Sequence, residues 1–249
     1  MSDLKGRIAL VTGGSRGIGA ATAKAFAERG ATVIVVHRHS AEAAETVVAE
    51  LPGEGHRVLQ CDVAETADLI RLRDDIQGLE GRISFLINNA GWTTLVPHHD
   101  LNGLTDDIIE RNFKVNTIGL LKTCRELAPL LRAGQPGGAI VNVSSVAARI
   151  GMGSSIAYCA SKLAVESITQ TLARVFAPDI RVMAVAPGLT ATSMAANWTE
   201  DEIAKRVQSN AMKRMAEPEE IAAAIVHTAA DLTYSTGSSI LAEGGRLLY

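Results

Sequence analysis

The chain has 249 residues, 47% of them hydrophobic, so it can bury one sizeable core, and its formal net charge of −3 argues against a broad nucleic-acid-binding surface. Three scattered cysteines, Cys61, Cys124 and Cys159, exclude a disulfide framework and a cysteine-based zinc site, so we expect no metal and a reducing compartment. No apolar run reaches about 18 residues and the first residues lack an apolar leader, so we expect a cytoplasmic protein with no membrane partner.

Short apolar segments and helical patterns alternate along the chain. We expect strands at 8–11, 32–36, 57–60, 83–87, 140–143 and 180–185, and helices over 20–27, 41–51, 65–78 and around position 158. This alternation predicts a single Rossmann-type, doubly wound α/β domain over residues 1–249, with a mainly parallel seven-stranded sheet and helices on both faces. Residues 190–215 are the least regular, so we expect them to form a mobile cover; an ordinary connection with a short helix is the alternative.

The first strand runs directly into a glycine-rich turn. Its pattern is Gly-x-x-x-Gly-x-Gly rather than the strict Gly-x-Gly-x-x-Gly fingerprint, because position 22 is Thr. Glycines permit a tight turn and close backbone approach, and the N-terminus of the following helix attracts an anion such as a pyrophosphate. We expect the turn to bind a dinucleotide through Gly13, Ser15, Arg16, Gly17, Ile18 and Gly19. A strand-to-helix turn without a ligand is the alternative.

The same turn also matches the nucleophile elbow of α/β-hydrolases. Gly13, Ser15 and Gly17 form Gly-x-Ser-x-Gly, and His227 follows far enough downstream to complete a catalytic group. An elbow directly after the first strand, however, leaves no earlier strand to supply an oxyanion loop. A serine hydrolase that uses Ser15 is therefore the alternative from another reaction class.

The end of the second strand indicates which dinucleotide binds. An acidic residue about 20 residues beyond the glycine turn would hold the adenosine ribose of NAD. His37 and Arg38 stand there instead, no acid follows until Glu42, and Arg16 lies inside the turn. Two guanidinium groups near one ribose would bind a 2′-phosphate, which favours NADP(H). Either arginine alone could instead point into solvent.

Tyr158 and Lys162 are four residues apart in a helical segment, and Ser145 lies upstream at the end of an apolar run. Residues at i and i+4 share one helix face, so a phenol would lie beside an ammonium. A phenol has an unperturbed pKa of about 10, and a nearby cation lowers it. The pair is therefore suited to proton transfer near neutral pH. A half-buried Tyr with a solvated Lys one turn later is the alternative.

With these residues in place, the chain resembles the short-chain dehydrogenase/reductase family from about residue 6 to residue 245. The motifs occur in the family's order: the glycine turn, Asp62-Val63, Asn88-Asn89-Ala90-Gly91, Asn116, Ser145, Tyr158-x-x-x-Lys162 and Pro187-Gly188. The resemblance implies that the adenine is contacted by Asp62 and Val63. It also implies that the cofactor lies along Asn89, Ala90 and Gly91, with its nicotinamide carboxamide held by Pro187, Gly188, Thr190 and Thr192.

The resemblance also implies the chemistry. Tyr158 would donate a proton to a carbonyl oxygen while NADPH delivers hydride, and Ser145 would hydrogen-bond that oxygen. Lys162 would lower the pKa of Tyr158 and bind the nicotinamide ribose. Asn116 would hold a water that links Lys162 to solvent, or it would be a buried helix Asn satisfied by backbone. All four positions are filled, which argues against a dinucleotide-sensing protein without turnover.

The substrate is less defined. We expect the pocket wall to be mostly apolar and formed by Trp92, Thr93, 150–154, Leu189, Met194 and Trp198, with Arg149 as the one neighbouring cation. The chain also resembles 3-oxoacyl-carrier-protein reductases, but segments 135–138 and 177–179 lack the bases expected to meet an acidic carrier. A small-molecule ketone, or an alcohol oxidised in reverse, is therefore preferred. The resemblance implies a homotetramer with helices near 105–133 and 156–177 at its contacts.

Overall fold

The computed structural model describes residues 3–134, 137–192 and 199–248. These residues form a seven-stranded sheet in the order β3-β2-β1-β4-β5-β6-β7, and every neighbouring pair of strands is parallel. The strands are β1 (Ile8–Thr12), β2 (Thr32–His37), β3 (Arg57–Gln60), β4 (Phe85–Asn88), β5 (Gly138–Val143), β6 (Ile180–Pro187) and β7 (Ser239–Ala242).

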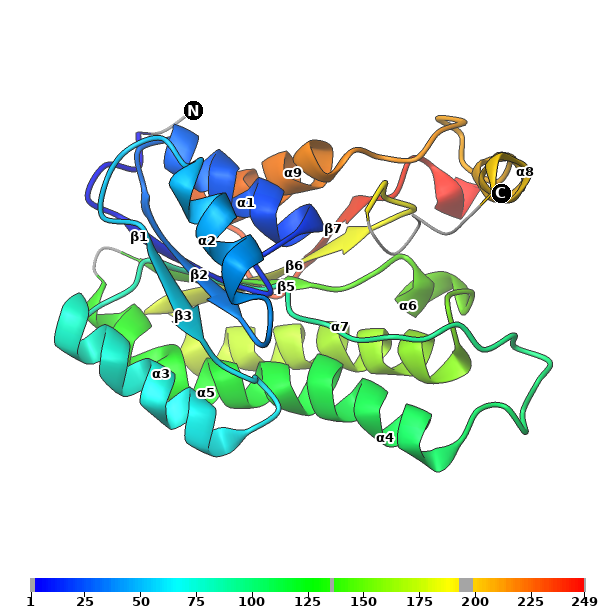
Figure 1. Cartoon of the computed structure of the whole chain (residues 1–249), viewed down its shortest axis with the longest axis horizontal. Coiled ribbons are helices and arrows are strands. Elements are labelled where there is room, and N and C mark those ends of the chain that lie inside the picture. Colours follow the sequence, from blue (N-terminus) through cyan, green and yellow to red (C-terminus); the bar gives the residue numbers. More distant parts are fainter. Residues whose placement is uncertain (1–2, 135–136, 193–198, 249) are drawn as a thin grey trace.

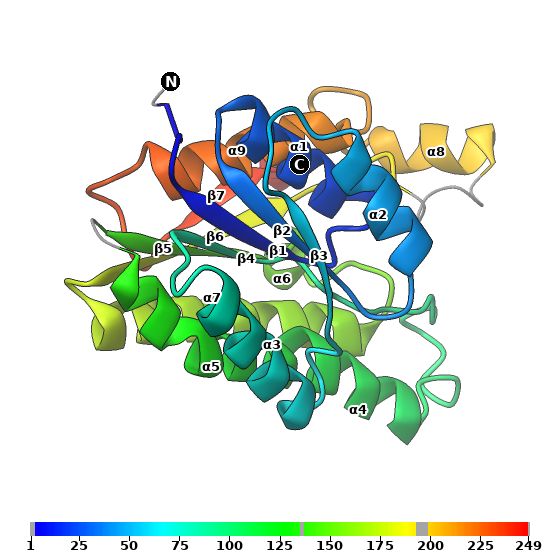
Figure 2. The same ribbon diagram turned by 60° about the vertical axis from the view of Figure 1, so that its left-hand side comes forward.

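Helices cover both faces of the sheet (Figures 1 and 2). One face carries α1 (Gly17–Glu28), α2 (Ala41–Ala49) and α9 (Pro218–Ala230). The other carries α3 (Thr66–Leu79), α4 (Asp106–Phe113), α5 (Leu120–Ala133) and α7 (Ile156–Phe176), with the π-helical turn η1 (Lys114–Gly119) joining α4 to α5. Short helices α6 (Ala147–Ile150) and α8 (Glu200–Val207) follow β5 and β6, and a 3-10 turn (Arg246–Leu248) follows β7.

The two faces of the sheet bury separate apolar clusters because strand side chains alternate in direction. In β1, Ile8 and Leu10 pack with the cluster under α3, α5 and α7, whereas Ala9 and Val11 pack with the cluster under α1 and α9. Burial on both faces explains why these strands are continuous apolar runs rather than alternating ones. The predicted doubly wound sheet is confirmed.

The order of the strands decides where a ligand can bind. The chain moves outward from β1 to β2 and β3, then returns to place β4 on the other side of β1. In such a sheet, a crevice forms outside the carboxyl ends of the strands at this reversal. The residues that follow β1, β2 and β4 therefore converge there.

Three details differ from the sequence prediction. The seventh strand, Ser239–Ala242, was not located by its short pattern, and the fourth begins at Phe85 rather than at residue 83. The expected cover over 190–215 contains α8, whose N-cap Thr199 forms a capping box with Glu202. Residues 193–198 of that cover lie outside the described part of the chain.

Candidate active site

The glycine turn after β1 adopts a geometry that only glycine accommodates at three positions. Gly13 and Gly17 have φ of +64° and +54°, in the left-handed region. A Cβ on Gly19 would collide with the carbonyl oxygen of Gly13 and the side-chain nitrogen of Asn89. The helix N-terminus therefore lies open to an approaching anion, as the pattern predicted.

Thr12 and Asn89 hold this turn in place. The Asn89 side chain donates to the carbonyl oxygens of Thr12 and Gly13, both at 3.0 Å. The Thr12 hydroxyl accepts from the backbone N–H groups of Asn89 at 3.0 Å and Ala90 at 3.1 Å. Asn89 thus supports the ends of β1 and β4, as expected. The part played by Thr12 was not predicted, although a polar residue ending an apolar strand is a signal for it.

A cavity of about 570 Å³ opens at the reversal of strand order. Its lining includes fourteen of the residues expected to bind a cofactor: Gly13, Ser15, Arg16, Gly17, Ile18, Gly19, His37, Arg38, Asp62, Val63, Asn89, Ala90, Gly91 and Thr192. Sequence reasoning missed five further residues of the lining, namely Val36, His39, Ser40, Cys61 and Val115; the remaining two are Trp92 and Thr93. A small cluster of Val63, Ala64, Val115, Ala90 and Trp92 forms an apolar wall of this cavity.

The residues after β2 lie at one end of the cavity. His37 is buried, and its Nδ1 atom has no hydrogen-bond partner among the described residues. Arg38 lies 3.7 Å from the carboxylate of Asp62, whereas Arg16 is exposed and makes no ion pair within the described chain. Arg38 is thus partly exposed and also faces the carboxylate of Asp62. The cluster offers two guanidinium groups and an unpaired imidazole nitrogen, a set that fits a phosphorylated ribose.

Helix α7 carries the central pair of the site. Its N-cap Ser155 accepts from the backbone N–H of Tyr158 at 3.1 Å, which fixes where the helix begins. Lys162 follows one turn later on the same face, and its side chain is buried. The Lys162 ammonium lies 5.9 Å from the centre of the Tyr158 ring and donates to the carbonyl oxygen of Val143 at 2.7 Å.

Burial determines the pKa values of this pair. Burial raises the pKa of Tyr158, while the hydrogen bond between the Ser145 and Tyr158 side chains acts in the opposite direction. Burial lowers the pKa of Lys162 to about 8. Desolvation is the largest cause of the Tyr158 shift and Lys162 is not among its causes, so the lowering of this pKa by Lys162 stays a prediction. Tyr158 is consequently a protonated phenol at neutral pH.

Ser145 comes from the end of β5. Its hydroxyl pairs with Tyr158 and accepts from the backbone N–H of Ala147 at 3.2 Å. The neighbouring Ser144 is buried and donates elsewhere, to the carbonyl oxygen of Lys162 and to Glu166. The spacing argument that selects Ser145 over Ser144 agrees with this geometry.

Asn116 lies in the π-helical turn η1 and is fully engaged through its side chain. It accepts from the backbone N–H of Trp92 at 2.7 Å, and it donates to the Trp92 carbonyl at 2.9 Å and to Ser161 at 3.0 Å. The side chain is therefore the buried, backbone-satisfied Asn of the alternative interpretation. Asn116 still lies near Lys162, because both side chains approach Gly91. A Cβ atom built on Gly91 would be 3.4 Å from the Asn116 side-chain oxygen and 3.7 Å from the Lys162 side-chain nitrogen. π-Helical turns are frequent at functional sites.

The loop after β6 borders the cavity from the other side. Gly188 donates to Ala242 and packs against the backbone of Glu243, where a side chain would collide. Thr190 bonds back to the carbonyl oxygen of Gly188 at 3.2 Å, and Thr192 contacts the glycine turn at Gly17. Thr192 lines the cavity, whereas Pro187, Gly188 and Thr190 shape the loop that presents it.

The expected substrate wall is brought together in part. The hydroxyls of Thr93 and Ser154 hydrogen-bond to each other, and the backbone N–H of Val96 donates to the Ser154 carbonyl at 2.8 Å. Met194 and Trp198 lie outside the described residues. Arg149 is paired with Glu166 at 3.1 Å, so its charge is already compensated and it is not a free cation for a substrate carboxylate.

The bases that would meet a carrier protein were expected at 135–138 and 177–179, but the described residues of these segments do not border the cavity. Residues 137–138 lead into the amino end of β5 and residues 177–179 into that of β6, while residues 135–136 lie outside the described chain. The cavity lies at the carboxyl ends of the strands, on the opposite edge of the sheet. The absence of bases in those connections therefore does not bear on docking beside the site.

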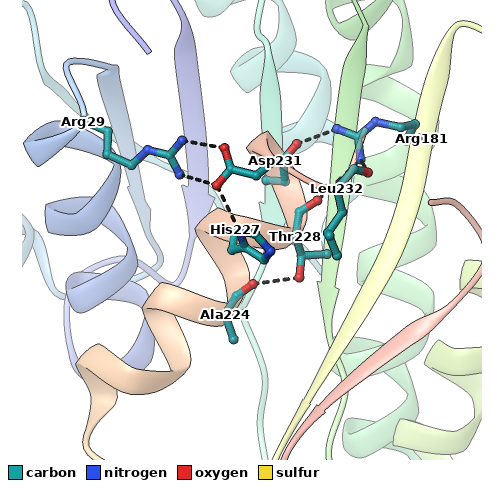
Figure 3. A network of polar contacts seen from close by, with 8 residues as sticks. Arg29, Arg181, Ala224, His227, Thr228, Asp231 and Leu232 are labelled. Carbon is teal, nitrogen blue, oxygen red and sulfur yellow. Dashed lines mark hydrogen bonds and ion pairs between the residues drawn. The ribbon is translucent and has the colours of Figure 1, made fainter. Parts of the chain in front are cut away.

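The two residues of the hydrolase alternative, Ser15 and His227, lie near opposite ends of α1. His227 pairs with Asp231 at 3.0 Å, and Asp231 also binds Arg29, just beyond the end of α1 (Figure 3). Ser15 precedes the start of this 12-residue helix, whose length is about 18 Å at a rise of about 1.5 Å per residue. That length lies between Ser15 and the Arg29–Asp231 pair, to which His227 is bound. Ser15 has no histidine base in reach at His227. Among the described residues there is also no cluster of metal-ligating side chains.

A cavity lined by the glycine turn at the reversal of a parallel sheet, with Ser145, Tyr158 and Lys162 near it, is typical of nicotinamide-dependent oxidoreductases. The family model for short chain dehydrogenases matches residues 7–203. The chain therefore belongs to the short-chain dehydrogenase family, as the resemblance predicted. No helix within the described residues is both long and apolar enough to cross a bilayer.

Relatives of known name extend over nearly the whole chain. Carbonyl reductase family member 4 of Danio rerio is 35% identical, covering 96% of this chain and 97% of its own. A 3-oxoacyl-[acyl-carrier-protein] reductase of Synechocystis is also 35% identical, covering 100% of both chains. A solved Pseudomonas aeruginosa RhlG/NADP active-site complex is 31% identical, covers 98% of this chain and 97% of its own, and superposes with a TM-score of 0.91.

Proposed function

We propose that the protein is an NADP(H)-dependent oxidoreductase that interconverts a ketone and a secondary alcohol. The observation that carries this proposal is the grouping of three residues: Ser145 follows β5 and acts on the pKa of Tyr158, and buried Lys162 lies one helical turn from Tyr158 and is bonded to Val143 at the end of β5. Lys162 approaches the cavity lining at Gly91, and the Tyr158 ring lies beside Gly153, the neighbour of Ser154.

When bound, NADPH would supply the hydride. Tyr158 would give its proton to the carbonyl oxygen of the substrate, because burial keeps the phenol protonated at neutral pH. Ser145 would hydrogen-bond the same oxygen and hold it at the phenol. Lys162 would turn its ammonium toward the nicotinamide ribose, and Asn116 would lie along the route by which Lys162 recovers a proton from water.

The preference for NADP(H) is supported by the end of the cavity that follows β2. Arg16 and Arg38 would bind a 2′-phosphate, and no carboxylate stands at position 37 to hold a free ribose hydroxyl. Asp62 reduces the advantage, since it lies 3.7 Å from Arg38. The RhlG structure that resembles this chain is a complex with NADP, which agrees with the proposal.

The proposal is tested by turnover with both cofactors. Purified protein is incubated with NADPH or NADH and an uncharged β-keto ester, ethyl acetoacetate, and oxidation of the reduced nicotinamide is followed by absorbance. We expect a higher kcat/KM with NADPH, and reversal of that preference in Arg38→Asp. Equal or better kcat/KM with NADH in the wild type would contradict the cofactor assignment, and no turnover with any ketone would contradict the reaction.

A second candidate is a 3-oxoacyl-carrier-protein reductase, favoured by the full-length similarity to the Synechocystis enzyme. The same assay distinguishes the two. A carrier-bound 3-oxoacyl thioester that is reduced much faster than its N-acetylcysteamine thioester would favour the carrier-dependent reaction. Equal rates would favour a free small molecule.

We also propose a homotetramer that uses α5 and α7. Apolar side chains stand exposed along this surface, with Ile118, Leu121 and Leu163 between 43% and 54% exposed. Burial of such side chains against a second copy would be favourable. Light scattering that gave the monomer mass of 26.2 kDa at micromolar concentration would refute this.

A further inference from the structure

Glu166 is the partly buried carboxylate closest along the chain to the catalytic pair. It follows Lys162 by four residues and Tyr158 by eight, so all three lie on one face of α7. Its side chain is only 12% exposed. A buried carboxylate needs compensating donors, and those of Glu166 come from three other elements.

Each of these donors has a defined contact. From the end of β5, the Ser144 hydroxyl lies 3.3 Å from Oε1. From β7, the Ser239 hydroxyl donates to the same oxygen at 3.2 Å. From α6, the Arg149 guanidinium contacts Oε2 through Nε at 3.2 Å and Nη2 at 3.1 Å. One side chain thus ties α7 to β5, α6 and β7.

The end of β5 is attached to α7 at two successive residues, just before Ser145. Val143 accepts from Lys162 and Ser144 bonds to Glu166, and the next residue, Ser145, is the group that acts on the pKa of Tyr158. A further attachment runs through α6. Arg149 on this helix binds Glu166, and the backbone N–H of Ala147, at the start of the same helix, donates to the Ser145 hydroxyl. Glu166 therefore holds both the residue before Ser145, which is Ser144, and the helix after it, which is α6. The position of Ser145 relative to Tyr158 depends on both contacts.

We propose that Glu166 is a positioning residue for the reaction, which holds the Ser145 hydroxyl at the Tyr158 phenol through Ser144 and Arg149. This rests on the proposed ketone reduction. Stability alone is a weak reason for such a group, since buried ion pairs contribute little net stability compared with apolar side chains. Small displacements of a positioned group, in contrast, cost large factors in rate.

Glu166→Gln tests this with a small change of shape, since the amide keeps one oxygen to accept from Ser144 but loses the charge that holds Arg149. The matched control is Glu126→Gln. The Glu126 side chain is also 12% exposed and pairs with two arginines. Glu126 and Arg125 lie on α5 and Arg73 lies on α3, away from the site. We expect kcat with NADPH and ethyl acetoacetate to fall about 10- to 100-fold in Glu166→Gln and less than about 2-fold in the control.

Two further measurements separate positioning from general loosening of the fold. NADPH affinity, measured by calorimetry, should stay within about 3-fold of the wild type in Glu166→Gln, because the cavity lining is untouched. In a Ser145→Ala background, Glu166→Gln should cost less than about 3-fold more, because residues that act as a unit are not additive. Ser144→Ala, which breaks one of the links, should also lower kcat while keeping NADPH affinity.

Several results would overturn the proposal. These are a Glu166→Gln enzyme that keeps more than half of wild-type kcat, a loss of NADPH affinity as large as the loss of kcat, or an equal loss in the Ser145→Ala background. If Glu166→Gln and Ser144→Ala both failed to fold while the Glu126 control folded, the role would be structural and the proposal wrong. A wild-type protein that reduces no ketone would instead refute the proposed function itself.

Discussion

Lys162 is a buried ammonium that the fold holds at a cost in stability, and Lys162→Met removes that cost while keeping the length of the side chain. The lysine is 5% exposed, and one contact is its donation to the Val143 carbonyl at 2.7 Å. Burial lowers its pKa from the ordinary 10.5 to about 8. The folded state therefore disfavours the charged form.

The magnitude follows from this difference. The pKa of Lys162 is about 2.5 units lower in the folded state, and each pKa unit corresponds to about 1.4 kcal/mol. Burial of the ammonium therefore lowers the free energy of unfolding by about 3 kcal/mol at neutral pH. Loss of the hydrogen bond to Val143 offsets about 1 kcal/mol of this. Lys162→Met should thus raise the free energy of unfolding by about 2 kcal/mol, or Tm by about 5 °C.

The dependence on pH has a definite sign. Because the folded-state pKa is depressed, the unfolded chain binds more protons between about pH 8 and pH 10.5, and wild-type stability should rise over that window. The advantage of the variant should be constant below about pH 8 and shrink above it. Urea unfolding of both proteins across this range measures the difference directly.

Activity provides the complementary measurement. Lys162→Met should lose both kcat and NADPH affinity, since the charge and the proposed ribose contact disappear together. Two results would refute the view that burial of the Lys162 ammonium destabilises the fold. One is a variant less stable than the wild type at pH 7, and the other is a difference in free energy of unfolding that does not change with pH.

Further predictions concern the phenol, the glycine turn and the α1–α9 contact. Tyr158→Phe should lower kcat by at least about 100-fold with NADPH affinity kept, and wild-type reduction should vary little from about pH 6 to 7 and weaken as pH rises through about 8, because the phenol stays protonated while Lys162 loses its charge; a variant keeping a tenth of wild-type turnover would contradict this. Gly19→Ala should weaken NADPH binding at least about 10-fold by calorimetry, whereas Gly78→Ala, whose Cβ meets nothing, should not; equal affinities would argue against the tight turn. Asp231→Asn breaks the partly buried pair with Arg29 and should lower the free energy of unfolding by about 2 kcal/mol with kcat unchanged, against less than about 0.5 kcal/mol for exposed Asp74→Asn; similar denaturant midpoints would contradict it.

Local pattern was sufficient for much of this protein. The apolar runs and the glycine turn predicted a parallel doubly wound sheet with a dinucleotide cavity, because burial on both faces and positive φ values leave direct marks on residue type. Ser145 precedes Tyr158 by 13 positions, and helical spacing places Lys162 beside Tyr158. These relations are short in sequence, so a single segment carries each of them.

Contacts between distant segments required the tertiary structure. No local pattern shows that Asn89 holds the glycine turn 76 residues earlier, or that Arg38 faces Asp62. The pKa of Tyr158 could not be inferred from its neighbour Lys162, because it depends on burial by the whole surrounding fold. Glu166 has no motif at all, since its donors Ser144, Arg149 and Ser239 meet it only when β5, α6 and β7 pack against α7. Residue type and short spacing thus determined the elements and the reacting groups, and packing between elements decided their charge states and their supports.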